Sequence, residues 1–220
     1  MESKKLSLPR HENTGPANSL PYRLARQQLA GIPDIEEQCR KGGAQYSLGN
    51  SGKSIVVQYL NRTYLITLPD AEISIMESPE EMPIKDRILI LHYLLTAKGT
   101  PPADKLIAFH ELPDGSVYYP TFAKRTIQPL VDNFGSDPSL LLPTSRKLGG
   151  QKADYGDMAV TINAFPRVPI TIVLWRGDSE FPARGNVLFD AAISHYLPTE
   201  DVTVLCETIA WRLVGLKRSA

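Results

Sequence analysis

Cysteine is scarce in this sequence, which has only Cys39 and Cys206 among its 220 residues. The two lie far apart and belong to no Cys-x-x-Cys pair and to no Cys/His spacing of the kind that holds zinc. The sequence therefore offers neither a disulfide framework nor a zinc site, and a reducing compartment fits it best.

An excess of charge of either sign is also absent, because Lys and Arg number 24 and Asp and Glu number 24. Without a net field the chain has no long-range attraction for nucleic acid or for an anionic membrane surface, and neither is an expected partner. No run approaches the ~20 apolar residues of a membrane span, and the first residues lack the apolar core of a signal peptide. We therefore expect a cytoplasmic protein.

The composition is that of a globular protein, with 42% hydrophobic and 22% charged residues. At 220 residues the chain lies at the upper end of single-domain length. A chain of this size can bury roughly 70 to 75% of the surface that it exposes when unfolded. Residues 1–20 mix Lys, Pro, Gly, Asn and Ser without periodicity, which predicts a mobile tail. Residues 21–220 are expected to form one globular domain.

Helical and strand patterns are interspersed in this domain without clear βαβ alternation. Helices are predicted at 22–31, 33–43, 84–99, 122–135, 136–150, 186–197 and 199–216. Strands are predicted at 54–60, 63–68, 72–76, 105–112, 117–120, 158–165 and 168–175. We expect 105–112 and 117–120 to form a hairpin or one strand with a kinked exit, and the last two strands to pair centrally in the sheet. The expected class is α+β, with a mainly antiparallel sheet and helices packed on it.

Two features that resemble known sites have simpler structural explanations. The string GNSGKS at 49–54 resembles a phosphate loop, but Ser47 stands where that motif needs its first glycine, which favours a surface turn. His92 lies in an apolar helix and His110 follows an apolar strand. Histidines in such places are more often hydrogen-bonded structural residues than ligands.

The segment from Trp175 to Asp201 is dense in charge and begins where an apolar strand ends. A rigid sheet positions such a loop while its side chains stay free, so binding and catalytic residues are often found there. Asp178 and Glu180 are candidates for acid/base chemistry or for binding a hard cation, and His195 for a further ligand or base. The predicted ligand-binding residues are Arg176, Asp178, Glu180, Phe181, Arg184 and His195.

Part of this segment has a purely structural explanation. Thr199 is predicted as the N-cap of the last helix, with Glu200 and Asp201 in the first turn, where negative charge favours the helix dipole. Asp190 and His195 are five residues apart on a predicted helix, so they would lie about 140° apart around its axis. The predicted ligand-binding site therefore narrows to the loop 176–184 together with His195.

Several long strings carry a resemblance to a known family, and the resemblance covers nearly all of the chain after Tyr22. They are ILILHYLLTAKGTPP at 88–102, ELPDGSVYYPTF at 111–122, GDMAVTINAFPRVPITIVLW at 156–175, LWRGDSEFP at 174–182 and HYLPTED at 195–201. In these strings the chain resembles an uncharacterised set of bacterial and archaeal proteins, the domain of unknown function family 3786. The resemblance supplies no catalytic residues.

The resemblance does imply a setting for the protein. Members of the family are typical of strict anaerobes, and some are fused to a cysteine-rich iron–sulfur domain. This implies work near low-potential electron transfer or corrinoid-dependent one-carbon metabolism. Two cysteines cannot hold a cluster that needs about four ligands, so no iron–sulfur cluster is expected within this chain. Any cluster would belong to a partner, an iron–sulfur or corrinoid protein.

Three functions are compatible with these observations, and whether the chain is an enzyme stays open. The first is a non-enzymatic binding module for a small cofactor, a corrinoid or another tetrapyrrole, or for a redox partner in anaerobic metabolism. The second is an assembly or interaction factor, for which an exposed apolar patch would be the sign. The third is a metal- or carboxylate-dependent hydrolase, which requires Asp178, Glu180 and His195 to converge in one cleft.

Overall fold

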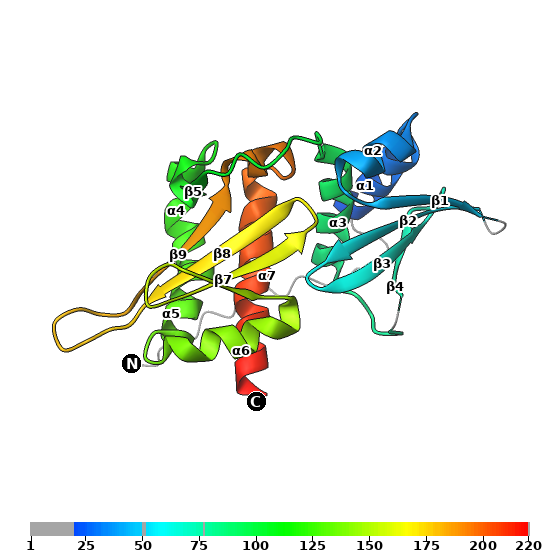
Figure 1. Cartoon of the computed structure of the whole chain (residues 1–220). Helices are drawn as coiled ribbons and strands as arrows, with labels where there is room; N and C mark the ends of the chain where they lie inside the picture. The colour runs from blue at the N-terminus through cyan, green and yellow to red at the C-terminus, as the bar shows by residue number, and fades with distance from the viewer. Residues whose placement is uncertain (1–19, 50–51, 77, 220) are drawn as a thin grey trace, which may run out of the picture.

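Two antiparallel sheets and the helices packed on them make up the fold, in a computed structural model that describes residues 20–49, 52–76 and 78–219 (Figure 1). The helices are α1 (Leu20–Ala30), α2 (Ile35–Lys41), α3 (Ile84–Thr96), α4 (Gly115–Phe122), α5 (Gln128–Phe134), α6 (Leu141–Ser145) and α7 (Thr199–Arg218). The strands are β1 (Gln45–Gly49), β2 (Gly52–Tyr59), β3 (Arg62–Thr67), β4 (Glu72–Ile75), β5 (Leu106–Ala108), β6 (Gln151–Ala153), β7 (Met158–Phe165), β8 (Val168–Trp175) and β9 (Arg184–Asp190). The predicted α+β class is confirmed. The tail predicted at 1–20 lies outside the described residues, except for Leu20.

The first sheet is a four-stranded meander in the order β1-β2-β3-β4. The sequence predicted its last three strands but not β1, whose side chains are almost all exposed and so give no alternation of apolar and polar residues. Leu60 and Asn61 form the tight β2–β3 turn, with φ of 47° and 63°, and Tyr59 pairs with Arg62 across it. Positive φ at both central residues matches the twist of a hairpin. The predicted strands 54–60 and 63–68 leave residues 61–62 for the turn, which is one residue later than the turn in the structure.

The second sheet has five strands in the order β5-β9-β8-β7-β6. Strands β7 and β8 pair across the short turn between Phe165 and Val168, as predicted. Strand β8 occupies the middle of the sheet, and its side chains from Ile170 to Leu174 are buried. The near-continuous apolar run of β8 is thus explained by cover on both faces.

Residues 117–120 belong to helix α4, so the predicted strand there is wrong. Only Leu106–Ala108 of the expected hairpin is a strand, and it pairs with β9. The carbonyl of Asp114 accepts hydrogen bonds from the first turn of α4, and Phe122 at its end stacks on Phe109 with ring centroids 3.8 Å apart. Val and Tyr favour strands locally, but this buried contact stabilises the helix, and packing overrides propensity.

The predicted helix at 186–197 is also wrong, because its first half is strand β9 and the rest is a 3₁₀ turn, Ala191–His195. Val187 and Phe189 are buried while Leu188 between them is half-buried, which is the two-residue period of a strand. Asp190 ends the strand, because its carboxylate accepts the backbone N–H groups of Ala103, Asp104 and Ala192. The angle of about 140° expected between Asp190 and His195 on one helix therefore does not apply.

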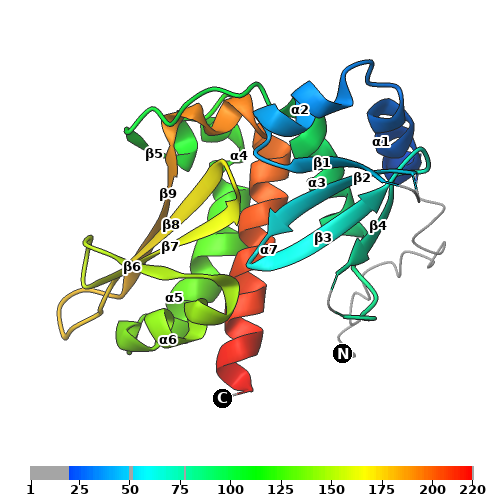
Figure 2. The same ribbon diagram turned by 45° about the vertical axis from the view of Figure 1, so that its right-hand side comes forward.

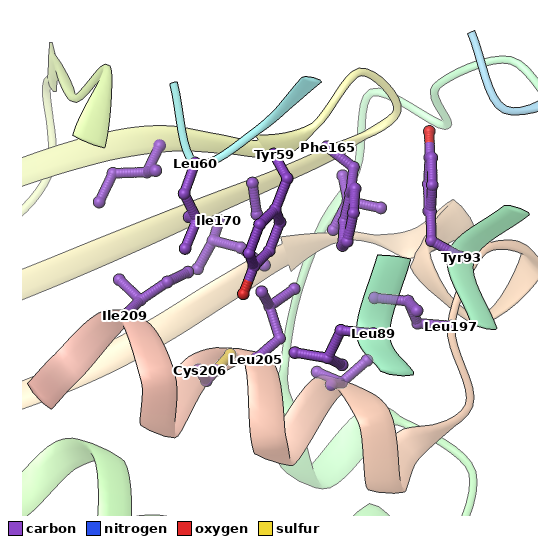
Figure 3. Packing of buried hydrophobic residues seen from close by; sticks show 14 of the residues in the cluster. Tyr59, Leu60, Leu89, Tyr93, Phe165, Ile170, Leu197, Leu205, Cys206 and Ile209 are labelled. Atoms are coloured by element: carbon purple, nitrogen blue, oxygen red, sulfur yellow. The ribbon is translucent and has the colours of Figure 1, made fainter. Parts of the chain in front are cut away.

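One core connects the two sheets; α7 passes behind β7 and β8 in Figure 1 and is seen between the two sheets in Figure 2. Tyr59 and Tyr93 pack on Phe165, with ring centroids 4.8 and 4.2 Å away, and Figure 3 shows these rings beside the apolar side chains of α7. The backbone N–H of Leu60 donates to the carbonyl of Ala164, which joins the turn after β2 to the last residues of β7. Helix α3 lies in this core, as predicted. Among the described residues, no helix combines the length and apolar character needed to cross a membrane.

Candidate functional site

The connection between β8 and β9, residues 176–183, carries most of the predicted site residues. Figure 1 shows this loop projecting beyond the end of the five-stranded sheet, away from the helices. Its two ends are held in place because Trp175 and Arg184 are partners in the β8–β9 ladder. The sheet therefore presents the loop outside the body of the protein, as the sequence predicted for a polar segment at a strand end.

Asp178 shapes the loop from within. Its side chain accepts hydrogen bonds from the backbone N–H groups of Glu180 and Phe181, at 2.8 and 2.7 Å, and its own N–H donates to the carbonyl of Phe181 at 2.9 Å. The hydrogen bonds from Phe181 and then Glu180 lower the pKa of the Asp178 carboxyl below its ordinary value. Gly177 is needed beside it, because a Cβ there would lie 2.7 Å from the backbone nitrogen of Ala183. Asp178 is therefore a loop-forming residue whose Oδ1 accepts hydrogen bonds from within the loop.

A shallow hollow of about 320 Å³ lies at this loop, and we name it the β8–β9 surface. It is lined by the side chains of Trp175, Arg176, Phe181, Pro182 and Arg184. Its two aromatic side chains are exposed, Trp175 by 41% and Phe181 by 56%. The guanidinium of Arg184 lies 5.8 Å from the centre of the Phe181 ring, within cation–π range. Arg176 makes one long ion pair, 3.5 Å to Asp137. The hollow is thus apolar at its base and cationic at its margins.

His195 does not join this surface. It lies in the 3₁₀ turn after β9, at the opposite end of a seven-residue strand from Arg184, which is a separation of about 20 Å. Its side chain is exposed. Asp178 and Glu180 belong to the loop, so they do not converge with His195 in one cleft. Among the described residues, no three His, Cys, Asp or Glu side chains are grouped closely enough to hold a metal ion.

His92 has a partner that sequence reasoning missed. Its Nδ1 lies 2.8 Å from Oδ2 of Asp201, which is in the first turn of α7. This hydrogen bond raises the pKa of the His92 imidazole, against the opposing effect of partial burial. Thr199 is not the N-cap as predicted, since its hydroxyl donates to the carbonyl of Pro113 and Pro198 holds the cap position. Asp201 therefore pairs with His92 in addition to lying in the first turn of α7, where negative charge favours the helix dipole.

Asp86 is the second residue that sequence reasoning missed. It is fully buried on α3, where its carboxylate accepts a hydrogen bond from the Tyr59 hydroxyl at 2.8 Å and one from Nη2 of Arg212 at 2.7 Å. The signal was available, because Asp86 lies on the same helical stripe as the buried Ile90 and Tyr93. A carboxylate on the apolar face of a helix predicts a buried cationic partner.

The family of the chain can be stated at this point. The model of the family described as domain of unknown function, DUF3786, matches residues 34–212. The chain belongs to this family. The matched range covers both sheets, the β8–β9 loop and Asp86 with its partners. No curated protein and no solved structure matches the chain.

Proposed function

We propose that the chain is a non-enzymatic binding module that docks a partner protein through the β8–β9 surface. The observation that carries this is the exposure of Trp175 and Phe181 between Arg176 and Arg184 on a loop held outside the fold. Trp and Arg are enriched among the residues that dominate the energy of protein interfaces. Exposing two large aromatic rings has no benefit to folding, since neither adds to the core.

A protein partner suits this surface better than a small cofactor does. The hollow of about 320 Å³ lies near the lower limit of the ~300 to 1,000 Å³ found for ligand sites. Its lining has no His, Cys or Met side chain that could ligate the metal of a corrinoid or another tetrapyrrole. The exposed rings of Trp175 and Phe181 would leave much of a large cofactor in water. A partner's own surface would cover them.

The partner's docking patch should be acidic around an apolar centre. Arg176 and Arg184 are the charged side chains among those that line the hollow, whereas Asp178 and Glu180 belong to the same loop but do not line it. Complementary charge speeds association and selects the partner. The redox partner implied by the family resemblance, an iron–sulfur or corrinoid protein with an acidic face, is therefore the first class to test.

The test uses Trp175 as a reporter. The chain has two tryptophans, so Trp211→Phe leaves only the fluorescence of Trp175. We expect an acidic ferredoxin-type protein or a corrinoid protein to change this signal saturably, and Arg184→Glu to weaken binding about tenfold or more. Arg23→Glu on α1 is the matched control, because it makes the same charge change on an exposed residue of a distant helix. Equal loss in both variants, or no signal with either partner class, would reject the proposal.

A second titration addresses the small cofactors. Cobalamin and haemin are added to the same Trp211→Phe chain, with and without Phe181→Ala. We expect neither to bind below ~100 μM, which corresponds to only about 5.5 kcal/mol. Tighter binding that Phe181→Ala abolishes would make the β8–β9 surface a cofactor site and overturn protein docking.

An assembly role is the alternative that a separate observation favours. Val117, Tyr118 and Tyr119 on α4 are exposed, Val117 by 78%, and they give the exposed apolar side chains that an interaction factor needs. Sedimentation of the Val117→Ser chain against the parent checks this role. A change of oligomeric state would favour it, and identical behaviour would leave docking through the β8–β9 surface as the proposal.

A further inference from the structure

A groove on another side of the molecule gathers three cations from three distant segments. It encloses about 400 Å³ between the β2–β3 turn, the 3₁₀ turn Arg146–Leu148 and the last turns of α7. Figure 2 shows the β2–β3 turn reaching α7 beside α6. Its cations are Arg62, Lys147 and Arg212, and its apolar wall is formed by Leu60, Leu148 and Leu216. We name it the Arg212 groove.

Arg212 is fixed before any ligand arrives. Its Nη2 donates to the buried carboxylate of Asp86 at 2.7 Å, and its guanidinium lies 5.6 Å from the centre of the Tyr59 ring. The hydroxyl of Tyr59 occupies the other carboxylate oxygen. A guanidinium has five N–H donors in a rigid plane, so one edge can hold Asp86 while the other remains available to the groove. The charge of Arg212 is balanced by Asp86.

The other two cations are not balanced in this way. Lys147 is exposed and makes no ion pair with any described residue. Arg62 pairs with Glu80 at 2.8 Å, but both side chains are exposed, by 41% and 62%. An exposed ion pair contributes only about 0 to 1 kcal/mol, so a better anion can displace Glu80. The groove therefore offers the positive charge of Lys147, and also that of Arg62 when a ligand displaces Glu80, beyond the Asp86–Arg212 pair.

Gly215 supplies an independent observation. It lies inside the 20-residue helix α7 and lines the groove, and a Cβ added to it would meet no atom within 4 Å. Glycine inside a helix is less stable than alanine, and neither positive φ nor a close backbone approach requires it here. The missing side chain leaves space between the cations and the apolar wall.

We propose that the Arg212 groove binds a small phosphate monoester with an apolar body. A phosphate monoester carries about two negative charges at neutral pH, which match Lys147 and an Arg62 released from its exposed pair with Glu80. Two guanidiniums and an ammonium suit its three oxygen atoms. The apolar body lies over Gly215 against Leu148 and Leu216. The volume falls within the ~300 to 1,000 Å³ of small-molecule sites. This site is independent of the β8–β9 surface.

The test titrates the full chain with phenyl phosphate, inorganic phosphate and benzoate, measured calorimetrically. We expect phenyl phosphate to bind about tenfold more tightly than either other probe, because inorganic phosphate lacks the apolar body and benzoate carries only one negative charge. Binding should weaken with added salt. Failure of phenyl phosphate to bind below ~10 mM would overturn the proposal. Benzoate binding as tightly as phenyl phosphate would also overturn it, since the site would then take carboxylates.

Gly215 provides a matched pair of variants. Gly215→Ala adds one methyl group into open space, so we expect unchanged binding and a slightly higher melting temperature. Gly215→Leu fills the groove, and we expect phenyl phosphate affinity to fall about tenfold or more. Both variants keep Asp86 and Arg212, so folding is preserved. Equal affinity in the two variants would place the ligand elsewhere.

Charge is tested separately with Lys147→Gln. We expect it to lower phenyl phosphate affinity about tenfold, because Lys147 lines the groove and forms no ion pair with a described residue. Lys152→Gln is the control, since Lys152 is equally cationic and exposed but lies on β6 outside the groove. The same loss in both variants would mean nonspecific attraction to net charge and would contradict the site.

Discussion

Arg212 and Arg184 both place a guanidinium beside an aromatic ring, at 5.6 and 5.8 Å from its centre, yet the chain holds them in opposite ways. Arg212 is tied to a buried carboxylate, and its side chain is 28% exposed. Arg184 is exposed, and its ring partner Phe181 is exposed too. The first cation is positioned by the core and the second by a surface loop.

The comparison separates residues that the fold depends on from residues that it does not. Removing one partner of a buried pair leaves an uncompensated charge in a medium of low polarity, which is costly. Changing an exposed side chain leaves both states solvated, so stability hardly moves. The Arg212 groove should therefore be coupled to folding, whereas the β8–β9 surface should be free to change with its partner.

The largest effect expected for an ionisable residue comes from Asp86→Ala. The change removes the partner of Arg212 and of the Tyr59 hydroxyl, and we expect the free energy of unfolding to fall by about 3 kcal/mol, the lower end of the range for a buried pair because Arg212 can still reach water. Urea unfolding followed by circular dichroism measures it. The double variant Asp86→Leu with Arg212→Met should recover part of the loss. If Asp86→Ala lowers the free energy of unfolding by less than ~1 kcal/mol, the fold does not depend on the buried pair of Asp86 and Arg212.

An intermediate effect is expected at the half-buried pair of His92 and Asp201. The pKa of His92 is raised by its hydrogen bond to Asp201, so the folded state favours the protonated imidazole. This stability is fully present below the unfolded pKa of about 6.5 and is lost as the pH rises through the higher folded pKa. We expect His92→Gln to cost about 0.5 to 1 kcal/mol at low pH and less at high pH. Thermal unfolding measured from mildly acidic to alkaline pH checks this.

The control for that prediction is His110→Gln, because His110 is exposed and forms no ion pair with a described residue. We expect the pH profile of the His92→Gln variant to differ from that of the His110→Gln variant. If both variants show the same pH profile, the pair with Asp201 is not the cause.

A local effect is expected for Asp178→Ala. The substitution removes the acceptor of the Glu180 and Phe181 amides, and we expect these amides to exchange about tenfold faster with solvent while the core amides of β8 do not change. Hydrogen exchange by mass spectrometry measures the difference. Ser179→Ala in the same loop is the matched control. Accelerated exchange throughout β8 would mean that the loop supports the sheet, and the fold would then depend on the β8–β9 loop.

The smallest effect on stability is expected for Phe181→Ser. The ring is 56% exposed, so the free energy of unfolding should change by less than ~0.5 kcal/mol, while affinity for the docking partner falls. The buried Phe165→Ala should cost about 3 to 5 kcal/mol in the same urea titration. A large loss of stability in Phe181→Ser would make the ring part of the fold.

The parts of the fold that the sequence predicted are those with a long local pattern. Helix α3 has apolar residues at helical spacing over thirteen positions, and strands β7 and β8 are apolar runs on either side of a short turn. The failures at 117–120 and 186–190 are short segments whose local preference was ambiguous. Their state was decided by contacts with Phe109 and with strands β5 and β8, which lie elsewhere in the chain.

The candidate site was predicted in part for the same reason. The loop 176–184 could be predicted from the sequence, because polar residues that follow an apolar strand form a local pattern. Its separation from His195 was not visible, because it depended on β9 being a strand that carries His195 to the far end of the sheet. The internal role of Asp178 was also hidden, since a carboxylate that accepts loop N–H groups has the same sequence as one that faces a ligand.

The sequence by itself determined the family, the α+β class, the loop as an exposed segment and the absence of a cysteine framework. Only the tertiary structure decided which ionisable residues meet. Asp86 and Arg212 are 126 positions apart, and His92 and Asp201 are 109 apart. The physical reason is that periodicity reports which face of an element is buried, whereas the partner across that face is chosen by how α3 and α7 pack.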